Sequence, residues 1–177
     1  ADIGRRRAQR ERGMGHELKK ISKSGIDEAI VKTELYRFLN EPEEAESICH
    51  DILAIEPEHQ LALRVLGLSI TDQFTGASSD RYGEVQKIFE RLRDHYERFY
   101  YLGLLHERRA KVQLRAGRPP HTLRVLFEEA MRCFEEAEKI RPKGNDDAIL
   151  RWNRCLRLLE SHGAAEEREE GIDFGDG

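Results

Sequence analysis

The chain has 177 residues, which is enough for one domain or a short array of repeats and too few for a large multidomain enzyme. Charged residues make up 36% of the chain and apolar residues 38%, a balance that is polar for a compact fold but ordinary for a thin, two-layered helical array. No uncharged stretch approaches the roughly 20 apolar residues of a transmembrane helix, so the sequence predicts no membrane span.

Charge is distributed unevenly along the chain. Residues 1–24 carry eight Lys or Arg against three acids, whereas residues 160–177 carry seven acids against one Arg. We therefore expect a basic N-terminal arm over residues 1–25, a folded domain over residues 26–160, and an acidic tail over residues 161–177 whose composition is typical of disorder. The arm lacks the apolar run of a secretory signal, so we expect a cytoplasmic location.

The predicted elements are helices, because Glu, Leu, Arg and Ala outnumber the β-branched residues and only five prolines interrupt the chain. The first helix is expected from Asp27 to Leu39 and is followed by a turn at residues 40–42. The second ends before Pro57, which cannot continue it. Its apolar face carries Ala45, Cys49 and Ile52.

A second pair of helices is expected after Pro57. Its first helix runs from Gln60 to Gln73, with an apolar face formed by Leu63, Leu66, Gly67 and Ile70. The polar segment Thr75–Asp80 is predicted to be flexible. A second helix then carries Val85, Phe89 and Leu92.

A third pair begins near Tyr96 and repeats both earlier patterns. Its first helix has Gly103 36 residues after Gly67, with Phe99, Leu102 and His106 at the offsets that Leu63, Leu66 and Ile70 occupy. After a turn at residues 117–120, its second helix carries Ala130, Phe134, Ala137 and Pro142 at the offsets of Ala45, Cys49, Ile52 and Pro57. A last helix is expected from Asp146 to Glu160, with Trp152 on its apolar face.

These offsets resemble the tetratricopeptide repeat, whose first helix carries a large residue, Leu-Gly and an aromatic, and whose second carries Ala, Phe, Ala and Pro. The resemblance covers residues 26–160 and implies an all-α fold, a short right-handed α-solenoid of about three helical hairpins plus a C-terminal capping helix. Small residues at the glycine positions let paired helices approach closely. Thr33 replaces that glycine in the first hairpin, and His106 takes the place of the packing aromatic in the third.

Enzymatic motifs are not found. The only Glu-x-x-His pair, Glu56 and His59, is interrupted by a proline, so no di-metal site is supported. There is no Gly-rich phosphate loop and no nucleophile elbow. The cysteines lack CxxC spacing and lie among apolar residues, which is typical of reduced, buried thiols: Cys49, Cys133 and Cys155. We expect neither a catalytic site nor a metal or cofactor.

The resemblance implies a protein-interaction scaffold or adaptor whose first helices line a concave, partner-binding face. Carried over by register, the predicted groove residues are Arg37, Arg64, Leu68, Asp72, Tyr100, Leu104, Glu107, Arg108, Asn153 and Arg157. Chaperone-binding members of the family grip a terminal carboxylate with Lys and Asn, but the matching positions here hold Ile30 and Glu34, so that clamp is absent.

An alternative function rests on the basic N-terminal arm. Arg5, Arg6 and Arg7 begin a run of cations that could neutralise phosphates, so the chain could be a nucleic-acid-associated protein whose array serves for dimerisation. The arm has no interleaved aromatics for base stacking. An anionic membrane surface is a further candidate, although Gly13 and Gly15 weaken any amphipathic helix there.

Overall fold

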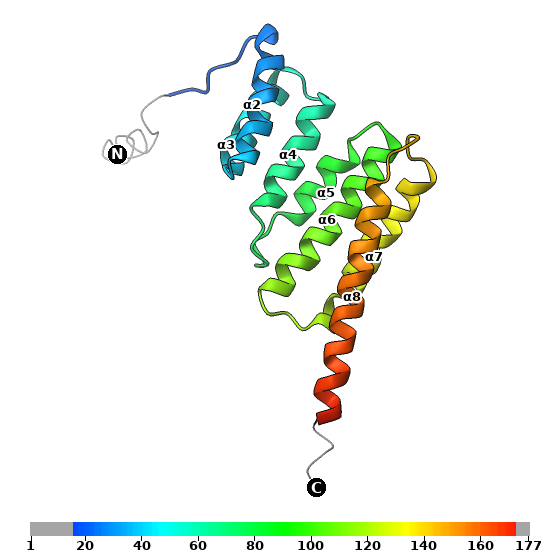
Figure 1. Ribbon diagram of the computed structural model, residues 1–177. Coiled ribbons are helices and arrows are strands. Elements are labelled where there is room, and N and C mark those ends of the chain that lie inside the picture. The colour runs from blue at the N-terminus through cyan, green and yellow to red at the C-terminus, as the bar shows by residue number, and fades with distance from the viewer. Residues whose placement is uncertain (1–15, 173–177) are drawn as a thin grey trace, which may run out of the picture.

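The structure, a computed structural model, describes residues 16–172, and for residues 163–172 it describes the backbone alone. Within this range the fold is entirely helical, as predicted, with no strand. None of the helices found there is both long enough and apolar enough to cross a membrane. The elements shown in Figure 1 are the 3-10 helix η1 (Lys23–Gly25) and the α-helices α2 (Ile26–Phe38), α3 (Pro42–Ile55), α4 (Gln60–Asp72), α5 (Tyr82–Glu90), α6 (His95–Arg115), α7 (Pro120–Lys139) and α8 (Asp147–Ile172).

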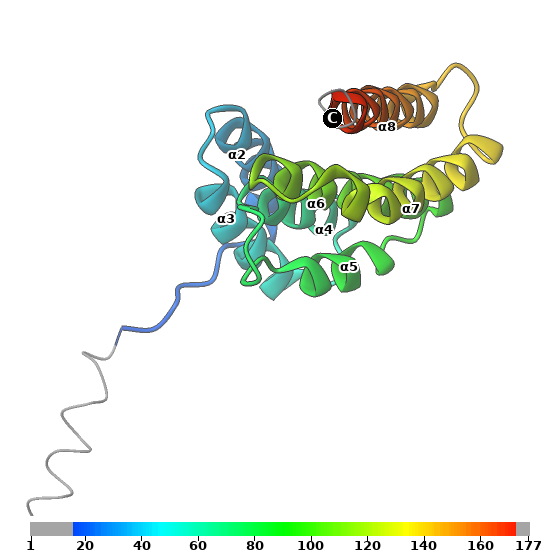
Figure 2. The ribbon, with the colours of Figure 1, turned by 90° about the horizontal axis from the view of Figure 1, so that it is seen from below.

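The helices form two layers. Each α-helix packs against the next one along the chain, and α2, α4, α6 and α8 also pack against one another in that order. These four helices therefore form one layer, and α3, α5 and α7 lie behind them (Figure 1). Viewed from below, α2 and α8 stand at the two sides of the first layer, with α4 and α6 between them (Figure 2).

Local residue choices explain where the helices begin and end. Pro42 and Pro120 occupy the first helical positions of α3 and α7, where the missing N–H has no intrahelical acceptor to lose. His59 accepts a hydrogen bond from the Ala62 amide at the start of α4, and Asp94 caps α6 in the same manner. The observed bounds of α2 and α4 agree with those expected from the sequence to within one residue.

Two glycines mark close helix crossings, as their place in the repeated pattern predicts. A Cβ atom built on Gly67 of α4 would lie 2.2 Å from Cε1 of Phe89 on α5. A Cβ atom on Gly103 of α6 would lie 2.7 Å from Cε1 of Phe134 on α7. Both rings are fully buried, so any side chain at either glycine would have to displace them.

The first hairpin fills the equivalent space differently. Thr33 on α2 and Cys49 on α3 stand at the positions of the glycine and the phenylalanine, and both are fully buried. The Thr33 hydroxyl donates a hydrogen bond to the carbonyl of Ile30 at 2.6 Å, so its burial leaves no unpaired polar atom. Compared with the other two hairpins, the first helix thus carries a residue larger than glycine, and the second helix carries a residue smaller than phenylalanine.

The segment between α4 and α5, predicted to be flexible, is instead an ordered turn. The Asp80 carboxylate accepts hydrogen bonds from the amides of Thr75 and Gly76 and from the Thr75 hydroxyl. Gly76 has a positive φ of 85°, and a Cβ there would lie 2.8 Å from the carbonyl oxygen of Val112 on α6. The turn is therefore fixed both by Asp80 and by close packing against α6.

The C-terminal helix is longer than the sequence pattern indicated. We expected it to end at Glu160, but α8 continues to Ile172, into the segment predicted to be a disordered tail. Ala164 and Ala165 and the glutamates that follow them are strong helix formers, which accounts for the extension. The basic arm lies outside the described residues as far as Gly15, and residues 16–20 are exposed.

Candidate binding groove

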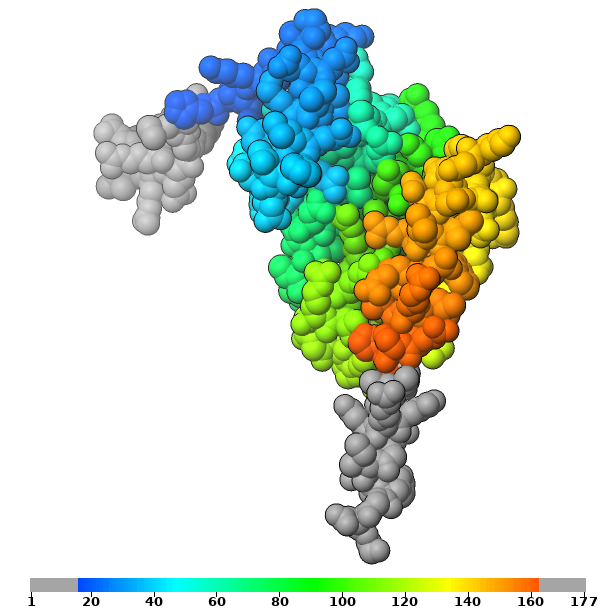
Figure 3. All heavy atoms as spheres, in the orientation of Figure 1, coloured from blue at the N-terminus to red at the C-terminus, as the bar shows by residue number. Residues whose placement is uncertain are grey.

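A groove of about 410 Å³ opens on the layer formed by α2, α4, α6 and α8. Figure 3 shows this face, with α2 in blue and α8 in orange on either side of the turquoise α4 and the green α6. All four helices contribute to its walls, and the turn after α4 adds Phe74. The lining residues are Arg37, Asn40, Pro42, Thr71, Asp72, Phe74, Arg108, Lys111, Val112, Arg115 and Arg151.

The groove is strongly basic. Five of its lining side chains are cations, and Asp72 is the one acid among the residues that line it. Three of the cations lie at successive turns of α6, because Arg108, Lys111 and Arg115 are spaced by three and four residues. Arg37 of α2 and Arg151 of α8 also line the groove.

Asp72 of α4 pairs with a cation on each of the neighbouring helices α2 and α6. One of its oxygens accepts a hydrogen bond from Nε of Arg37 at 2.7 Å, and the other accepts one from Arg108 at 2.5 Å. The same Arg108 nitrogen lies 2.5 Å from the Thr71 hydroxyl. Burial lowers the pKa of Arg108, and the Asp72 carboxylate opposes that shift. Asp72 therefore holds two guanidinium groups in place at the groove surface.

Glu107 of α6 also holds two cations in place, from a position beneath the groove surface. Its side chain is completely buried, and Oε1 accepts hydrogen bonds from Lys111 and, at 3.4 Å, from Arg151. Burial disfavours the charge of Arg151, but the Glu107 carboxylate and the Tyr100 hydroxyl together outweigh burial and raise the pKa of Arg151. Oε2 of Glu107 has no hydrogen-bond partner. One buried carboxylate thus neutralises part of the charge of two cations.

Arg115 is the cation that remains available. It lies at the last turn of α6, its side chain is exposed, and the described part of the chain offers it no ion-pair partner. The two carboxylates leave a surplus of positive charge on the groove. Such a surface favours carboxylate or phosphate ligands, because guanidinium groups bind both with paired N–H donors.

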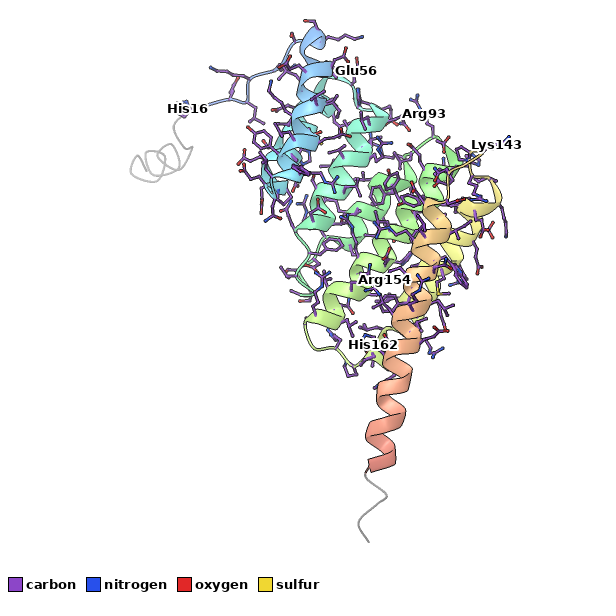
Figure 4. All side chains as sticks on the ribbon, viewed as in Figure 1. His16, Glu56, Arg93, Lys143, Arg154 and His162 are labelled. Atoms are coloured by element: carbon purple, nitrogen blue, oxygen red, sulfur yellow. The ribbon has the colours of Figure 1, made fainter. Side chains whose placement is uncertain are left out.

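A second cavity of about 460 Å³ lies on the same layer, at the other end of α4 and α6. Three tyrosines from the first turns of α6 line it together with carboxylates and one arginine. The lining residues are Arg64, Asp94, Tyr96, Glu97, Tyr100, Tyr101, Pro142, Asn145 and Asp147. This end of the molecule can be found in Figure 4 by the labels Arg93 and Lys143, and the other end by the label His162. Arg93 immediately precedes Asp94, and Lys143 lies four residues before Asp147.

The structure brings together some of the predicted groove residues and separates others. Arg37, Asp72 and Arg108 line the basic groove, while Arg64 and Tyr100 line the second cavity. Leu104 was expected on the groove surface, but it is 3% exposed and belongs to the core, so that assignment is wrong. The remaining four do not line either cavity: Leu68 is partly buried against the core, Glu107 lies beneath the groove, Asn153 is partly buried, and Arg157 is exposed.

Several residues that line the groove were not predicted from the sequence. Lys111 and Arg115 continue the helical spacing of Arg108. This spacing could have identified them, since α6 continues to Arg115. Arg151 was not among the predicted groove residues, although it lines the groove from α8. The choice of Arg157 therefore selected the wrong face of α8. Phe74 follows α4 in the inserted turn, for which the repeat pattern gives no register.

The other ionisable groups of the described residues include three cysteines and several histidines. No group of three or more His, Cys, Asp or Glu is placed there to hold a metal ion. Burial raises the pKa of the Cys49 and Cys155 thiols to about 12, and it also raises the pKa of Cys133, so all three are thiols rather than thiolates at neutral pH. The three cysteines are free; Cys49 and Cys155 are buried, as expected, whereas Cys133 is only partly buried.

His106 lies between α5 and α6, away from both cavities. One of its ring nitrogens is 2.8 Å from the hydroxyl of Tyr82, and the two ring centroids are 5.8 Å apart. Burial, together with the charges of Arg109 and Arg132, lowers the pKa of His106 to about 4. The imidazole is therefore neutral at pH 7 and forms part of the packing between helices, as its position in the repeated pattern predicted.

Comparison of the chain with protein-family models and with curated proteins gives no match, so the function of the groove is argued from its geometry.

Proposed function

We propose that this chain is a protein-interaction module that binds an acidic segment of a partner protein in its basic groove. The observation that carries the proposal is the convergence of five cations from α2, α6 and α8 on one groove whose lining contains a single acid. Carboxylates of the partner would pair with these cations, and Phe74 and Val112 supply apolar contact.

A tetratricopeptide-like architecture, a short right-handed α-solenoid, agrees with this function. Three features support it: the alternation of helices between two layers, the glycine and phenylalanine crossings at Gly67 and Gly103, and the groove on the layer of first helices. In such an array the first helix of each hairpin contributes to one shared binding surface. Arg37, Asp72 and Arg108 come from the first helices of three successive hairpins in this interpretation.

A partner protein fits the groove better than a nucleic acid does. Phe74 is the one aromatic ring among the lining residues, whereas single-stranded nucleic acids are held by several stacking rings. Four of the five cations are anchored by Asp72 and Glu107 in a compact cluster rather than in a track along which a phosphate backbone could run. We therefore keep nucleic-acid binding as an outcome of the test.

The test measures binding of a fluorescent peptide of alternating aspartate and glutamate to the whole chain. Arg115→Glu should weaken binding at least about tenfold, because Arg115 is exposed and has no ion pair to lose among the described residues. Lys87→Glu is the matched control: Lys87 is exposed on α5, in the other layer, and the charge change is the same. Wild-type affinity is expected for this control.

Three outcomes would count against the proposal. Equal loss of affinity in both variants would mean that binding follows net charge alone. Failure of the acidic peptide to bind to the wild type would remove the acidic segment as the ligand. Tighter binding of a single-stranded oligonucleotide, abolished by deletion of residues 1–15, would assign the activity to the basic arm instead.

A further inference from the structure

Three tyrosine rings form one wall of the second cavity, hereafter the tyrosine pocket. Tyr96 and Tyr100 are stacked, with ring centroids 5.8 Å apart and planes inclined by 16°. Tyr101 meets Tyr100 edge to face at 5.1 Å. All three rings come from the first turns of α6, so the helix itself fixes their arrangement. Aromatic faces held in this way present negative potential to a ligand.

Carboxylates form the rim of the tyrosine pocket. Asp94, Glu97 and Asp147 line it, and Arg64 is the one cation among the lining residues. Arg64 is already paired with Glu97 at 2.7 Å, which leaves the other two carboxylates without a cation from the pocket. Burial, followed by the charge of Asp147, raises the pKa of Tyr96 to about 12, which agrees with a negative potential inside the pocket.

The protein itself shows that its tyrosines accept cations. The guanidinium carbon of Arg64 lies 5.9 Å from the centroid of Tyr101, and that of Arg109 lies 4.1 Å from the centroid of Tyr82. A cation over an aromatic face with carboxylates nearby gains both from the ring quadrupole and from the opposite charges. Neutral or anionic side chains gain from neither.

We infer that the tyrosine pocket binds a lysine or arginine side chain of the same partner segment whose acidic residues occupy the basic groove. This inference deepens the proposed function, and its acidic half rests on it. The ligand would then carry charge of opposite sign at its two ends. The direction in which it lies along the groove is set by the protein, because the negative pocket is at one end of α4 and α6 and the basic groove is at the other.

The two sites are close enough for one short segment. Tyr100 and Arg108 lie eight residues apart on α6, which corresponds to about 12 Å along the helix axis. An extended peptide covers this separation with about four residues. The sites also adjoin, because the Tyr100 hydroxyl contributes to the raised pKa of Arg151, which lines the basic groove.

The test compares two peptides by isothermal titration calorimetry. Both contain the acidic run, and one has lysine about four residues from it where the other has norleucine, which has the same four-carbon chain without the ammonium group. Wild-type protein should bind the lysine peptide about five- to tenfold more tightly than the norleucine peptide. A ratio near one would overturn the inference while leaving the proposed function intact, since the acidic run would still bind.

Variants assign the lysine effect to the pocket. In the double variant Asp94→Asn, Asp147→Asn the ratio should fall to near one, and asparagine at position 94 retains the cap of α6. Tyr100→Ala should have the same effect if the chain folds. Tyr36→Ala is the control, because Tyr36 is a partly buried tyrosine of α2 that lines neither cavity. An undiminished ratio in the double variant would overturn the inference.

A last measurement separates the pocket from the groove. Nα-acetyl-lysine amide, which has no carboxylate, is titrated into the wild-type protein while the tyrosine ring resonances are followed by NMR. Shifts of the Tyr96 and Tyr100 signals that the norleucine analogue does not produce would support the pocket, even if the acidic peptide failed to bind and the proposed function fell. Identical responses to the two analogues would overturn the inference on its own.

Discussion

The ring of Phe134 on α7 lies so close to Gly103 on α6 that no Cβ atom fits between them. Phe89 and Gly67 repeat this relationship between α5 and α4. Each glycine gives up helix propensity so that a phenylalanine from the following helix can pack against the backbone of its neighbour. Two of the three hairpins are therefore held by the same contact.

Gly103→Ala tests this contact. Alanine is favoured over glycine in a helix by about 1 kcal/mol, but overpacking a rigid core costs about 1–3 kcal/mol. We expect the free energy of unfolding in urea to fall by up to about 2 kcal/mol, the difference between these two effects. Gly83→Ala on α5 is the control, because no atom lies within 4 Å of its Cβ position, and it should be neutral or slightly stabilising. Equal effects of the two changes would contradict the close crossing.

Glu107 should be important for stability because it is the buried carboxylate shared by Lys111 and Arg151. Glu107→Ala removes the partner of both cations and leaves a cavity, so we expect a loss of about 2–4 kcal/mol in the free energy of unfolding. Glu136→Ala removes the surface partner of Lys139, and no measurable change is expected there. A small effect of Glu107→Ala would indicate that water reaches this carboxylate.

His106 should make stability depend on pH. Its pKa is about 4 in the folded chain and near 6.5 when unfolded, so the unfolded state takes up the proton more readily. The contribution of the neutral imidazole is complete above pH 6.5 and is lost as the pH falls towards 4. Because His106 is half-buried, solvent screening reduces the expected loss to about 1–2 kcal/mol.

The measurement is urea denaturation of the wild type and of His106→Gln at several pH values between 7 and 4. The carboxylates titrate in both proteins, so the difference between the two curves isolates the imidazole. We expect the wild type to lose more stability than the variant over this interval. Parallel curves would show that His106 has an ordinary pKa in the folded chain.

Asp80→Ala should release the turn between α4 and α5. Without the carboxylate, the amides of Thr75 and Gly76 lose their acceptors, and the peptide bond after Arg81 becomes accessible. Limited trypsin digestion should then cleave at Arg81 roughly tenfold faster than in the wild type. Ser79→Ala, at an exposed position in the same turn, should be cleaved at the wild-type rate.

Sequence patterns predicted those features that depend on local spacing. The bounds of α2 and α4, the burial of Cys49 and Cys155 and the crossings at Gly67 and Gly103 follow from helical periodicity and from the size of single residues, which can be read along one element. The turn at Asp80 was missed because its order comes from side-chain acceptors and from packing on α6, a helix that begins fifteen residues later in the chain.

The groove was predicted only in part, for a related reason. Repeat register predicted Arg37, Asp72 and Arg108 on one face, and all three line the basic groove, because they lie on helices with a recognisable pattern. α8 carries no such pattern, so Arg157 was chosen instead of Arg151. Glu107 looks like a surface residue among its charged neighbours on α6, and its complete burial depends on Arg151, which arrives from another helix 44 positions later.

The exchange of glycine and phenylalanine for Thr33 and Cys49 in the first hairpin limits how this chain could be rearranged. Each helix is matched in volume to its own partner, so α2 placed against α5 would set a threonine where Phe89 tolerates only glycine. In the reverse swap, α4 would take the place of α2 beside α3, which would pair Gly67 with Cys49 and leave a void. Recombination that moves whole hairpins preserves this core, whereas recombination that moves single helices breaks it.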